Sequence, residues 1–200
     1  PLLWGEMARL DAPWEAPAAE PRAPGPLLPS RDDQWSHLVD HVVSLANELG
    51  VGDFSLHLGV ALLGEHQRRA REGRRCGLEP ALAATACLKL ADAFDEHSQE
   101  YFQREKAAAY QAAARRWTAA AILGAEKAVA ELVEFGLHRP TAAWFLSAAL
   151  DVASRGGAPV PREAAQVARL VADLALLDLE LQRHPARLRA QCALLLALAC

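Results

Sequence analysis

The sequence predicts an all-α protein, and three observations support this prediction. Alanine and leucine dominate a composition that is 52% hydrophobic but only 6% aromatic, and both residues lose little conformational freedom on entering a helix. No run alternates valine, isoleucine, threonine or tyrosine with polar residues, as a half-buried strand requires. Apolar residues instead recur at helical spacing between glycine and proline breakers. The chain of 200 residues is long enough for one large domain or two small ones, each with a buried core.

Residues 1–30 are expected to form a disordered or extended tail. They hold seven of the twelve prolines of the chain, as in APWEAPAAEPRAPGPLLP. Proline inside a helix removes a hydrogen bond and clashes with the preceding turn, so this segment cannot propagate a helix. Trp4 and Trp14 have two interpretations: they dock on the folded part, or they are isolated apolar residues of a tail. The second interpretation is favoured.

The first two helices are expected over residues 32–50 and 53–71. In the first, apolar residues recur every three or four positions, with Asp32 or Asp33 as the expected N-cap and Gly50 as the C-cap. The second is almost wholly apolar over its first three turns, and we therefore expect it to lie at the centre of the fold.

An alanine-rich helix is expected next, over residues 78–96. Pro80 falls in its first turn, where the missing N–H costs nothing, and its small residues let neighbouring helices approach closely. The segment 98–124 holds no strong breaker before Gly124. This predicts one long helix that bends, if at all, near Arg116.

A glycine and a proline separate the helices that follow. Gly136 is expected to end a helix over residues 123–136, and Pro140 is expected to begin the next helix with its missing N–H at an expendable position. The remaining helices are expected over residues 141–155, 161–182 and from about Pro185 to the end. Five helices, a short linker and three more helices predict two compact helical units, the second of them incomplete.

Charge, hydropathy and cysteine content narrow the possible functions. The formal net charge of −4 gives no reason to expect nucleic acid or an anionic membrane as the main partner. The most apolar tract, CALLLALAC, is too short to cross a bilayer, and the sequence shows no signal peptide. The four cysteines include no Cys-x-x-Cys pair, so we expect neither a disulfide framework nor a zinc site and infer a reducing intracellular setting. Because the chain opens on Pro1 and stops inside the apolar tract, we expect it to be a fragment.

No catalytic or cofactor-binding motif stands out. There is no Ser-His-Asp order, phosphate-cradling glycine loop or paired-carboxylate site with usable spacing, so we expect neither an enzyme nor a cofactor. His37 and His41 fall on one helix face, but a metal site needs a third ligand, and surface or groove histidines are the favoured interpretation. The basic segment QRRAREGRR, residues 67–75, is either a nuclear-localisation or phosphate-binding patch or a helix C-terminus whose arginines offset the macrodipole. We favour the helix C-terminus.

Four segments, in the same order along the chain, resemble segments of one known protein family. HLVDHVVSLANELGVGDFSLHLGVALLGEHQ resembles the opening of a cyclin box, LEPALAATACLKLADAFDE its third, central helix, and AEKAVAELVEFGLHRPTAAWFL its fifth helix and exit. AQVARLVADLALLDLELQRHPARLRAQCALLLALA is similar to the start of a C-terminal box. The likeness covers residues 32–200 and implies a divergent cyclin fold. It places a five-helix N-terminal cyclin box over residues 31–138 and the start of a truncated C-terminal box over residues 139–200.

The resemblance implies a regulatory subunit that binds a cyclin-dependent protein kinase, because cyclins are not themselves enzymes. In the family, helices three and five of the first box press on the movable C-helix of the kinase, so that the kinase's Lys–Glu pair can form. The matching contact residues here are Glu126, Phe94 and Phe135. Without the resemblance, Glu126 is simply an exposed acid favoured by the dipole near a helix N-terminus.

The sequence departs from the family at several of these positions. Ala93 replaces the family lysine, and Ala130 replaces a leucine whose burial is worth about 1.5–3 kcal/mol. Lys89, one helical turn before Ala93, either reaches the same seam or is a solvated, snorkelling lysine, which is the favoured interpretation. A buried Arg–Asp pair of the family is replaced at both ends, by Trp35 and Gly64, so neither charge is left without the other.

The substrate-docking groove of the family is expected to be absent or altered. Its matching positions are Gln34, His37, Leu38 and His41, of which only Leu38 is apolar. The groove is therefore a weak candidate site.

Two functions stay open. The first is a cyclin-like subunit that binds and regulates a cyclin-dependent protein kinase, in the nucleus and/or cytoplasm, without direct contact to nucleic acid or membrane. The alternative is a non-activating cyclin-fold scaffold or adaptor in transcription or meiotic machinery. The missing lysine and Arg–Asp pair favour the alternative, and the retained glutamate and two phenylalanines favour the first. A generic helical-repeat protein is disfavoured because the expected helices differ in length.

Overall fold

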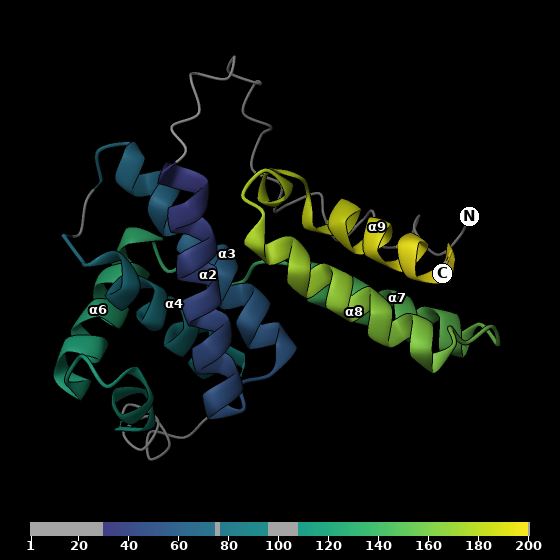
Figure 1. Ribbon diagram of the computed structural model, residues 1–200, viewed down its shortest axis with the longest axis horizontal. Coiled ribbons are helices and arrows are strands. Elements are labelled where there is room, and N and C mark those ends of the chain that lie inside the picture. The colour runs from purple at the N-terminus through teal and green to yellow at the C-terminus, as the bar shows by residue number, and fades with distance from the viewer. Residues whose placement is uncertain (1–29, 75–76, 96–107, 200) are drawn as a thin grey trace. The chain divides into compact units, whose positions relative to one another are not determined.

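The computed structural model describes residues 30–74, 77–95 and 108–199, and every regular element in these ranges is a helix (Figure 1). The prediction of an all-α protein is therefore confirmed. The described chain divides into two compact units, one over His37–Arg139 and one that combines residues 30–36 with residues 140–199. Residues 1–29 of the tail predicted over 1–30, and residues 98–107 of the segment 98–124, lie outside the described residues.

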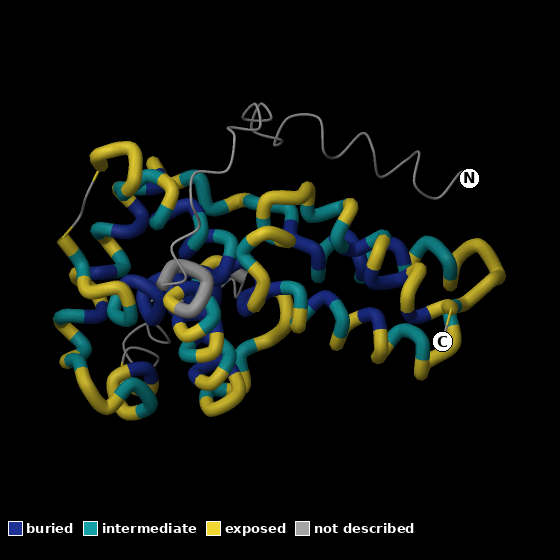
Figure 2. The backbone as a smooth tube through the Cα atoms, turned by 45° about the horizontal axis from the view of Figure 1, so that its top comes forward, coloured by how far each residue is buried: buried dark blue, intermediate teal, exposed yellow. Residues whose placement is uncertain are grey.

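In the unit His37–Arg139, one central helix is covered by its neighbours. The helices in chain order are α2 (Ser30–Leu49), α3 (Asp53–Arg71), α4 (Pro80–Asp95), a helical stretch over residues 108–114, and α6 (Ala119–Leu132). Residues 83–92 of α4 are all buried, and α4 packs against both α3 and α6 (Figure 2). The core of this unit is therefore built around α4, and α3, which was expected to be central, is also buried over residues 55–60 and at Leu62 and Leu63.

Glycine allows α3 and α4 to pack at close range. A Cβ atom added at Gly59 of α3 would lie 3.0 Å from the Cα atom of Leu88 in α4. Real side chains almost never approach a backbone atom this closely, so a larger residue would push the two helices apart.

The end of α2 agrees with the sequence, but its beginning does not. Gly50 adopts a left-handed φ of 66° directly after the last helical residue, as expected of a C-cap glycine. At the other end, Asp32 and Asp33 fall inside α2, which includes Ser30. Neither aspartate is therefore the N-cap.

The prediction of one long helix over residues 98–124 is wrong. The helical stretch 108–114 is followed by a break, with Arg115 at a φ of 50°. A new helix, α6, begins at Ala119, because the hydroxyl of Thr118 accepts a hydrogen bond from the N–H of Ala121 at 3.2 Å. Gly124 is an interior residue of α6 and breaks nothing.

The turn after α6 also differs from the prediction. The helix ends at Leu132, four residues before Gly136, and the left-handed positions are Glu134 and Phe135, with φ of 57° and 56°. The N–H of Phe135 closes the turn by donating to the carbonyl of Ala130 at 2.8 Å. A left-handed conformation costs a residue with a side chain about 1–2 kcal/mol.

From Pro140 on, the described part of the second unit contains the helices α7 (Ala142–Arg155), α8 (Arg162–Leu174) and α9 (Ala186–Ala199). The short 3-10 helices η1 (Ala175–Leu177) and η2 (Leu181–Arg183) lie between α8 and α9. The N-cap of α7 is Thr141, whose hydroxyl accepts from the N–H of Trp144 at 3.3 Å, so Pro140 does not begin the helix. Alanines with Phe145 and Leu146 form the core of this unit.

The single helix predicted over residues 161–182 is broken in this unit. The carboxylate of Asp178 accepts hydrogen bonds from the N–H groups of Glu180 and Leu181, at 2.8 and 3.1 Å, and so holds a turn where the helix was expected to continue. Nearby, the indole N–H of Trp35 donates to the carbonyl of Leu176 at 3.0 Å. Trp35, only 1% exposed, is thus buried with its polar group satisfied. Among the helices described, none is both long and apolar enough to span a bilayer.

Replacing Gly59 with alanine is expected to destabilise the protein by about 1–3 kcal/mol, because the new methyl group meets the backbone of α4. Gly124→Ala is the matched control, since a Cβ there has no atom within 4 Å and alanine favours a helix interior by about 0.5–1 kcal/mol. Denaturant unfolding of both variants measures the difference. An equal shift of the two midpoints would contradict the close packing of α3 on α4.

Candidate functional site

A buried ion pair joins α4 to α6 at the predicted contact surface. The ammonium Nζ of Lys89 lies 2.6 Å from Oε2 of Glu126. The lysine is 1% exposed and the glutamate 15%. The favoured interpretation of Lys89 as a solvated lysine is therefore wrong, and the alternative, that it reaches the seam of Glu126, is correct. Because its side chain is almost inaccessible, Lys89 pairs with Glu126 and has almost no surface for contact with a binding partner.

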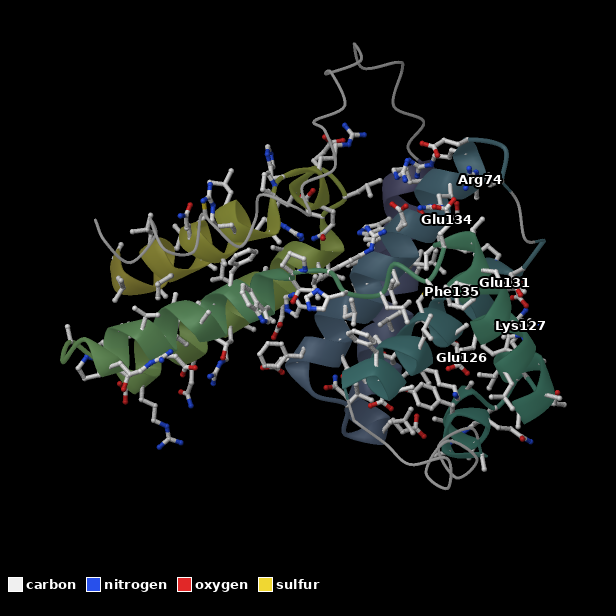
Figure 3. The ribbon with its side chains drawn as sticks, turned by 180° about the vertical axis from the view of Figure 1, so that it is seen from behind. Arg74, Glu126, Lys127, Glu131, Glu134 and Phe135 are labelled. Atoms are coloured by element: carbon white, nitrogen blue, oxygen red, sulfur yellow. The ribbon has the colours of Figure 1, made fainter. Side chains whose placement is uncertain are left out.

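The two faces of α6 have different chemistry (Figure 3). Ala130, 6% exposed, lies on the inner face one turn after Glu126. On the outer face, the ammonium of Lys127 lies 3.8 Å from the carboxylate of Glu131, with the two side chains 78% and 56% exposed. Exposed pairs of this kind contribute little, at about 0.3–0.5 kcal/mol. Of the three charged residues of α6, Glu126 is therefore the one that pairs with a buried charge.

Two predicted contact residues are exposed aromatic side chains. Phe94, near the end of α4, is 43% exposed, and Phe135, in the turn after α6, is 69% exposed. The ring of Phe94 meets His138 edge-on, with ring centroids 6.3 Å apart. Since His138 follows Phe135 by three residues, both phenylalanines belong to the region where α4 ends and the chain leaves α6. Ala93 is half-buried beside them.

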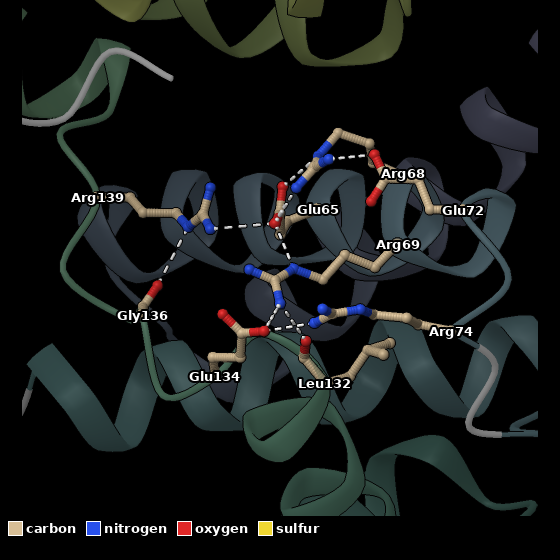
Figure 4. A network of polar contacts seen from close by, with 9 residues as sticks. All are labelled: Glu65, Arg68, Arg69, Glu72, Arg74, Leu132, Glu134, Gly136 and Arg139. Carbon is tan, nitrogen blue, oxygen red and sulfur yellow. Dashed lines mark hydrogen bonds and ion pairs between the residues drawn. The ribbon is translucent and has the colours of Figure 1, made fainter. Parts of the chain in front are cut away.

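An arginine–glutamate network at the end of α3 lies next to this region (Figure 4). Its centre is Glu65, which is 9% exposed and accepts hydrogen bonds from Arg68 at 2.6 and 2.8 Å and from Arg69 at 2.6 Å. The guanidinium of Arg139 lies 3.6 Å away. The hydrogen bonds from Arg68, with those from Arg69 and the charge of Arg139, lower the pKa of Glu65 to about 2, although burial opposes this shift.

The same network holds the turn after α6. A second nitrogen of Arg69 donates to the carbonyl of Leu132 at 2.8 Å, and it lies 3.0 Å from the carboxylate of Glu134. Arg74 also pairs with Glu134. The hydrogen bond from Arg74 is the main reason that the pKa of Glu134 lies below its usual range. The described part of the basic segment, residues 67–74, is therefore a helix C-terminus, as favoured. Arg68, Arg69 and Arg74 bind carboxylates, and Arg69 also binds the end of α6.

Arg139 completes the network from the chain that follows the turn. Its Nε donates to the carbonyl of Gly136 at 3.1 Å. Burial lowers the pKa of Arg139 below its usual range, and the charge of Glu65 opposes this effect. Sequence reasoning found none of the contacts between α3 and this segment. The only available signal was the spacing of Glu65 to Arg68 and Arg69, which predicts the contacts within α3.

Of the four predicted groove positions, Gln34 and His37 are exposed, His41 is half-buried and Leu38 is buried. Nε2 of His41 lies 2.9 Å from the hydroxyl of Thr85, and its ring meets Trp117 edge-on at 6.1 Å. Burial lowers the pKa of His41 below 6.5. The contact of His41 with Thr85 therefore connects α2 to α4. Among the described residues, no three His, Cys, Asp or Glu side chains lie close enough together to hold a metal ion.

Comparisons with known proteins were made on the whole chain. No protein-family model matches it, and none of the curated proteins matches it either. The case for a function therefore rests on the residues described above.

Glu126→Gln is expected to destabilise the protein by about 2–4 kcal/mol, because the buried ammonium of Lys89 then faces an amide in place of a carboxylate. The matched control is Glu131→Gln on the same helix, which removes an exposed pair and should change stability by less than about 0.5 kcal/mol. Chemical denaturation gives both values. A change at Glu126 as small as that at Glu131 would show that the ion pair contributes little.

The pKa of Glu65 also predicts a pH dependence of stability. Because this pKa is lower in the folded protein than the ordinary 4.5, the carboxylate stabilises the fold fully above pH 4.5 and less as the pH falls towards 2. Between pH 5 and pH 2 the wild type should lose about 1–3 kcal/mol more than Glu65→Gln does. Urea unfolding across this range tests the prediction, and parallel curves for the two proteins would refute it.

Proposed function

We propose that this chain is a cyclin-like regulatory subunit that binds a cyclin-dependent protein kinase through the end of α4 and the turn after α6. The observation that carries this proposal is the exposure of Phe94 and Phe135, at 43% and 69%. Both occupy positions where the resemblance to cyclins implies kinase contacts. Exposed aromatic side chains that become buried in a partner's pocket supply much of the binding energy of protein interfaces.

The proposed contact is mainly apolar. Glu126 is only 15% exposed and is already paired with Lys89 at 2.6 Å, so it has little charge to offer a kinase. Ala93 and Ala130 are small, and Ala130 is buried. The proposed affinity therefore depends on the two phenylalanines, and the acid contributes chiefly by placing α6 against α4.

The effect on the kinase follows from where this surface would press. In kinases, a Lys–Glu ion pair must form before phosphoryl transfer, and the glutamate sits on a movable C-helix. A subunit that buries its phenylalanines against this helix favours the inward position and so shifts the kinase towards its active state. In this proposal the chain carries out no catalysis itself and acts in the nucleus and/or cytoplasm, where its kinase is found.

The second candidate is a cyclin-fold scaffold or adaptor, in transcription or meiotic machinery, that does not activate a kinase. The Lys89–Glu126 pair supports it, because these two charged groups are turned towards each other and not towards a partner. A partner can then bind this surface through apolar contacts alone. Such binding does not require a kinase C-helix to move. Kinase activity, measured beside binding, separates the two candidates.

Phe94→Ala combined with Phe135→Ala is expected to weaken kinase binding by about 100-fold, because each truncation at an interface centre costs about 1–2 kcal/mol or more. Titration of the chain against a panel of purified cyclin-dependent kinases measures this affinity, and phosphorylation of a peptide substrate measures activation. Lys127→Ala is the matched control on α6 and should bind as the wild type does. Binding without activation would favour the scaffold, and binding unchanged by the double substitution would refute the surface.

A further inference from the structure

The turn after α6 holds an exposed phenylalanine in an unfavourable backbone conformation. Glu134 and Phe135 are consecutive and both lie in the left-handed region, with φ of 57° and 56°. Neither is a glycine or an asparagine, which tolerate this region best. Such residues persist where surrounding contacts hold them, and they gather at binding sites.

One arginine, Arg69, makes two side-chain contacts that help to hold this turn (Figure 4). Arg69 is itself fixed by a hydrogen bond from its Nε to Glu65 at 2.6 Å. Its other end binds the carbonyl of Leu132 at 2.8 Å, just before the turn, and the carboxylate of Glu134 at 3.0 Å, within it. Because Arg69 is only 13% exposed, these contacts are partly shielded from water. The turn is thus attached to α3 at two points, one at Leu132 just before it and one at Glu134, its first left-handed residue.

We propose that Arg69 is a positioning residue that keeps the turn in its left-handed form and so presents Phe135, already in place, to the partner. This inference rests on the proposed function, because it deepens the role given there to Phe135. A ring held in its bound position before the encounter loses less conformational freedom on binding. Arg69 therefore contributes to affinity without touching the partner.

The network also defines the kind of pocket that fits this surface. Arg69 and Arg74 both pair with the carboxylate of Glu134, the residue directly before Phe135. The negative charge beside the ring is therefore compensated within the chain. The partner's pocket for Phe135 is apolar and needs no basic group beside it.

The first test compares two neighbouring arginines by hydrogen exchange of the full 200-residue chain. Arg69→Gln removes the contacts to the turn, and we expect the Phe135 amide, which donates to Ala130, to exchange about tenfold faster or more. Arg68→Gln is the matched control, because Arg68 also binds Glu65 but pairs otherwise only with Glu72 of its own helical end. Equal exchange of this amide in both variants would overturn the inference.

The second test is a double-mutant cycle on kinase affinity. Arg69→Gln should weaken binding by about as much as Phe135→Ala, and the combination should be no weaker than Phe135→Ala alone. Additive losses would show that Arg69 does not act through Phe135 and would overturn the inference. Thermal unfolding of each variant checks the fold. If Arg69→Gln unfolds, Glu134→Gln, which removes the carboxylate that Arg69 binds within the turn, replaces it in both tests, with Arg74→Gln as its control.

The two tests separate this inference from the proposed function. If the wild type binds no kinase, the proposed function is overturned, and the exchange of the Phe135 amide alone decides whether Arg69 holds the turn. If the kinase binds and depends on Phe135 but not on Arg69, the proposed function stands and the inference fails.

Discussion

The burial of Lys89 in the middle of α4 is the constraint on which the arrangement of this unit depends. The ten residues 83–92 are all buried, so α4 meets other elements on every side at this level. A lysine there must keep a carboxylate close by, since a buried charge without one costs several kcal/mol. Glu126 supplies it at 2.6 Å. Turning α6 by one residue would swing this carboxylate by about 100°, away from the lysine.

The pair therefore selects which face of α6 is packed inwards. Ile122, Ala125, Val129 and Val133 are all nearly inaccessible, and their spacing places them on the same side of the helix as Glu126. Lys127 and Glu131 are left on the outer side. The chain leaves α6 at Leu132 and turns back past the end of α3. The second polar cluster, around Glu65, meets the chain at that turn.

Most helix positions followed from the sequence because their signals are local. The helix expected over residues 141–155 is observed as Ala142–Arg155, and Gly50 ends α2 as its type predicts. The failures occurred where a side chain stops or starts a helix by its own hydrogen bond. Thr118 and Asp178 do this, and neither stands out among helix-forming neighbours. Threonine and aspartate are common inside helices, so the choice depends on how the flanking segments pack.

The candidate site was harder to predict than the helices, for two physical reasons. Lys89 and Glu126 are 37 positions apart, and a periodic pattern does not say which turns of two helices meet. A lysine side chain is also long enough to span about one turn of 5.4 Å, so Lys89 reaches Glu126 although it lies one turn before Ala93, the position of the family lysine.

The left-handed turn was also hard to predict, because it depends on contacts between residues far apart in the sequence. Glycine was available at position 136, yet the conformation falls on Glu134 and Phe135, because Arg69 and Arg74 bind the glutamate there. The ring of Phe135, 69% exposed, buries too little surface to offset the cost of its own backbone. Arg69 of α3 and Arg74 just beyond it help to hold the turn through Glu134, and this is a reason to look for the use of Phe135 outside the folded chain.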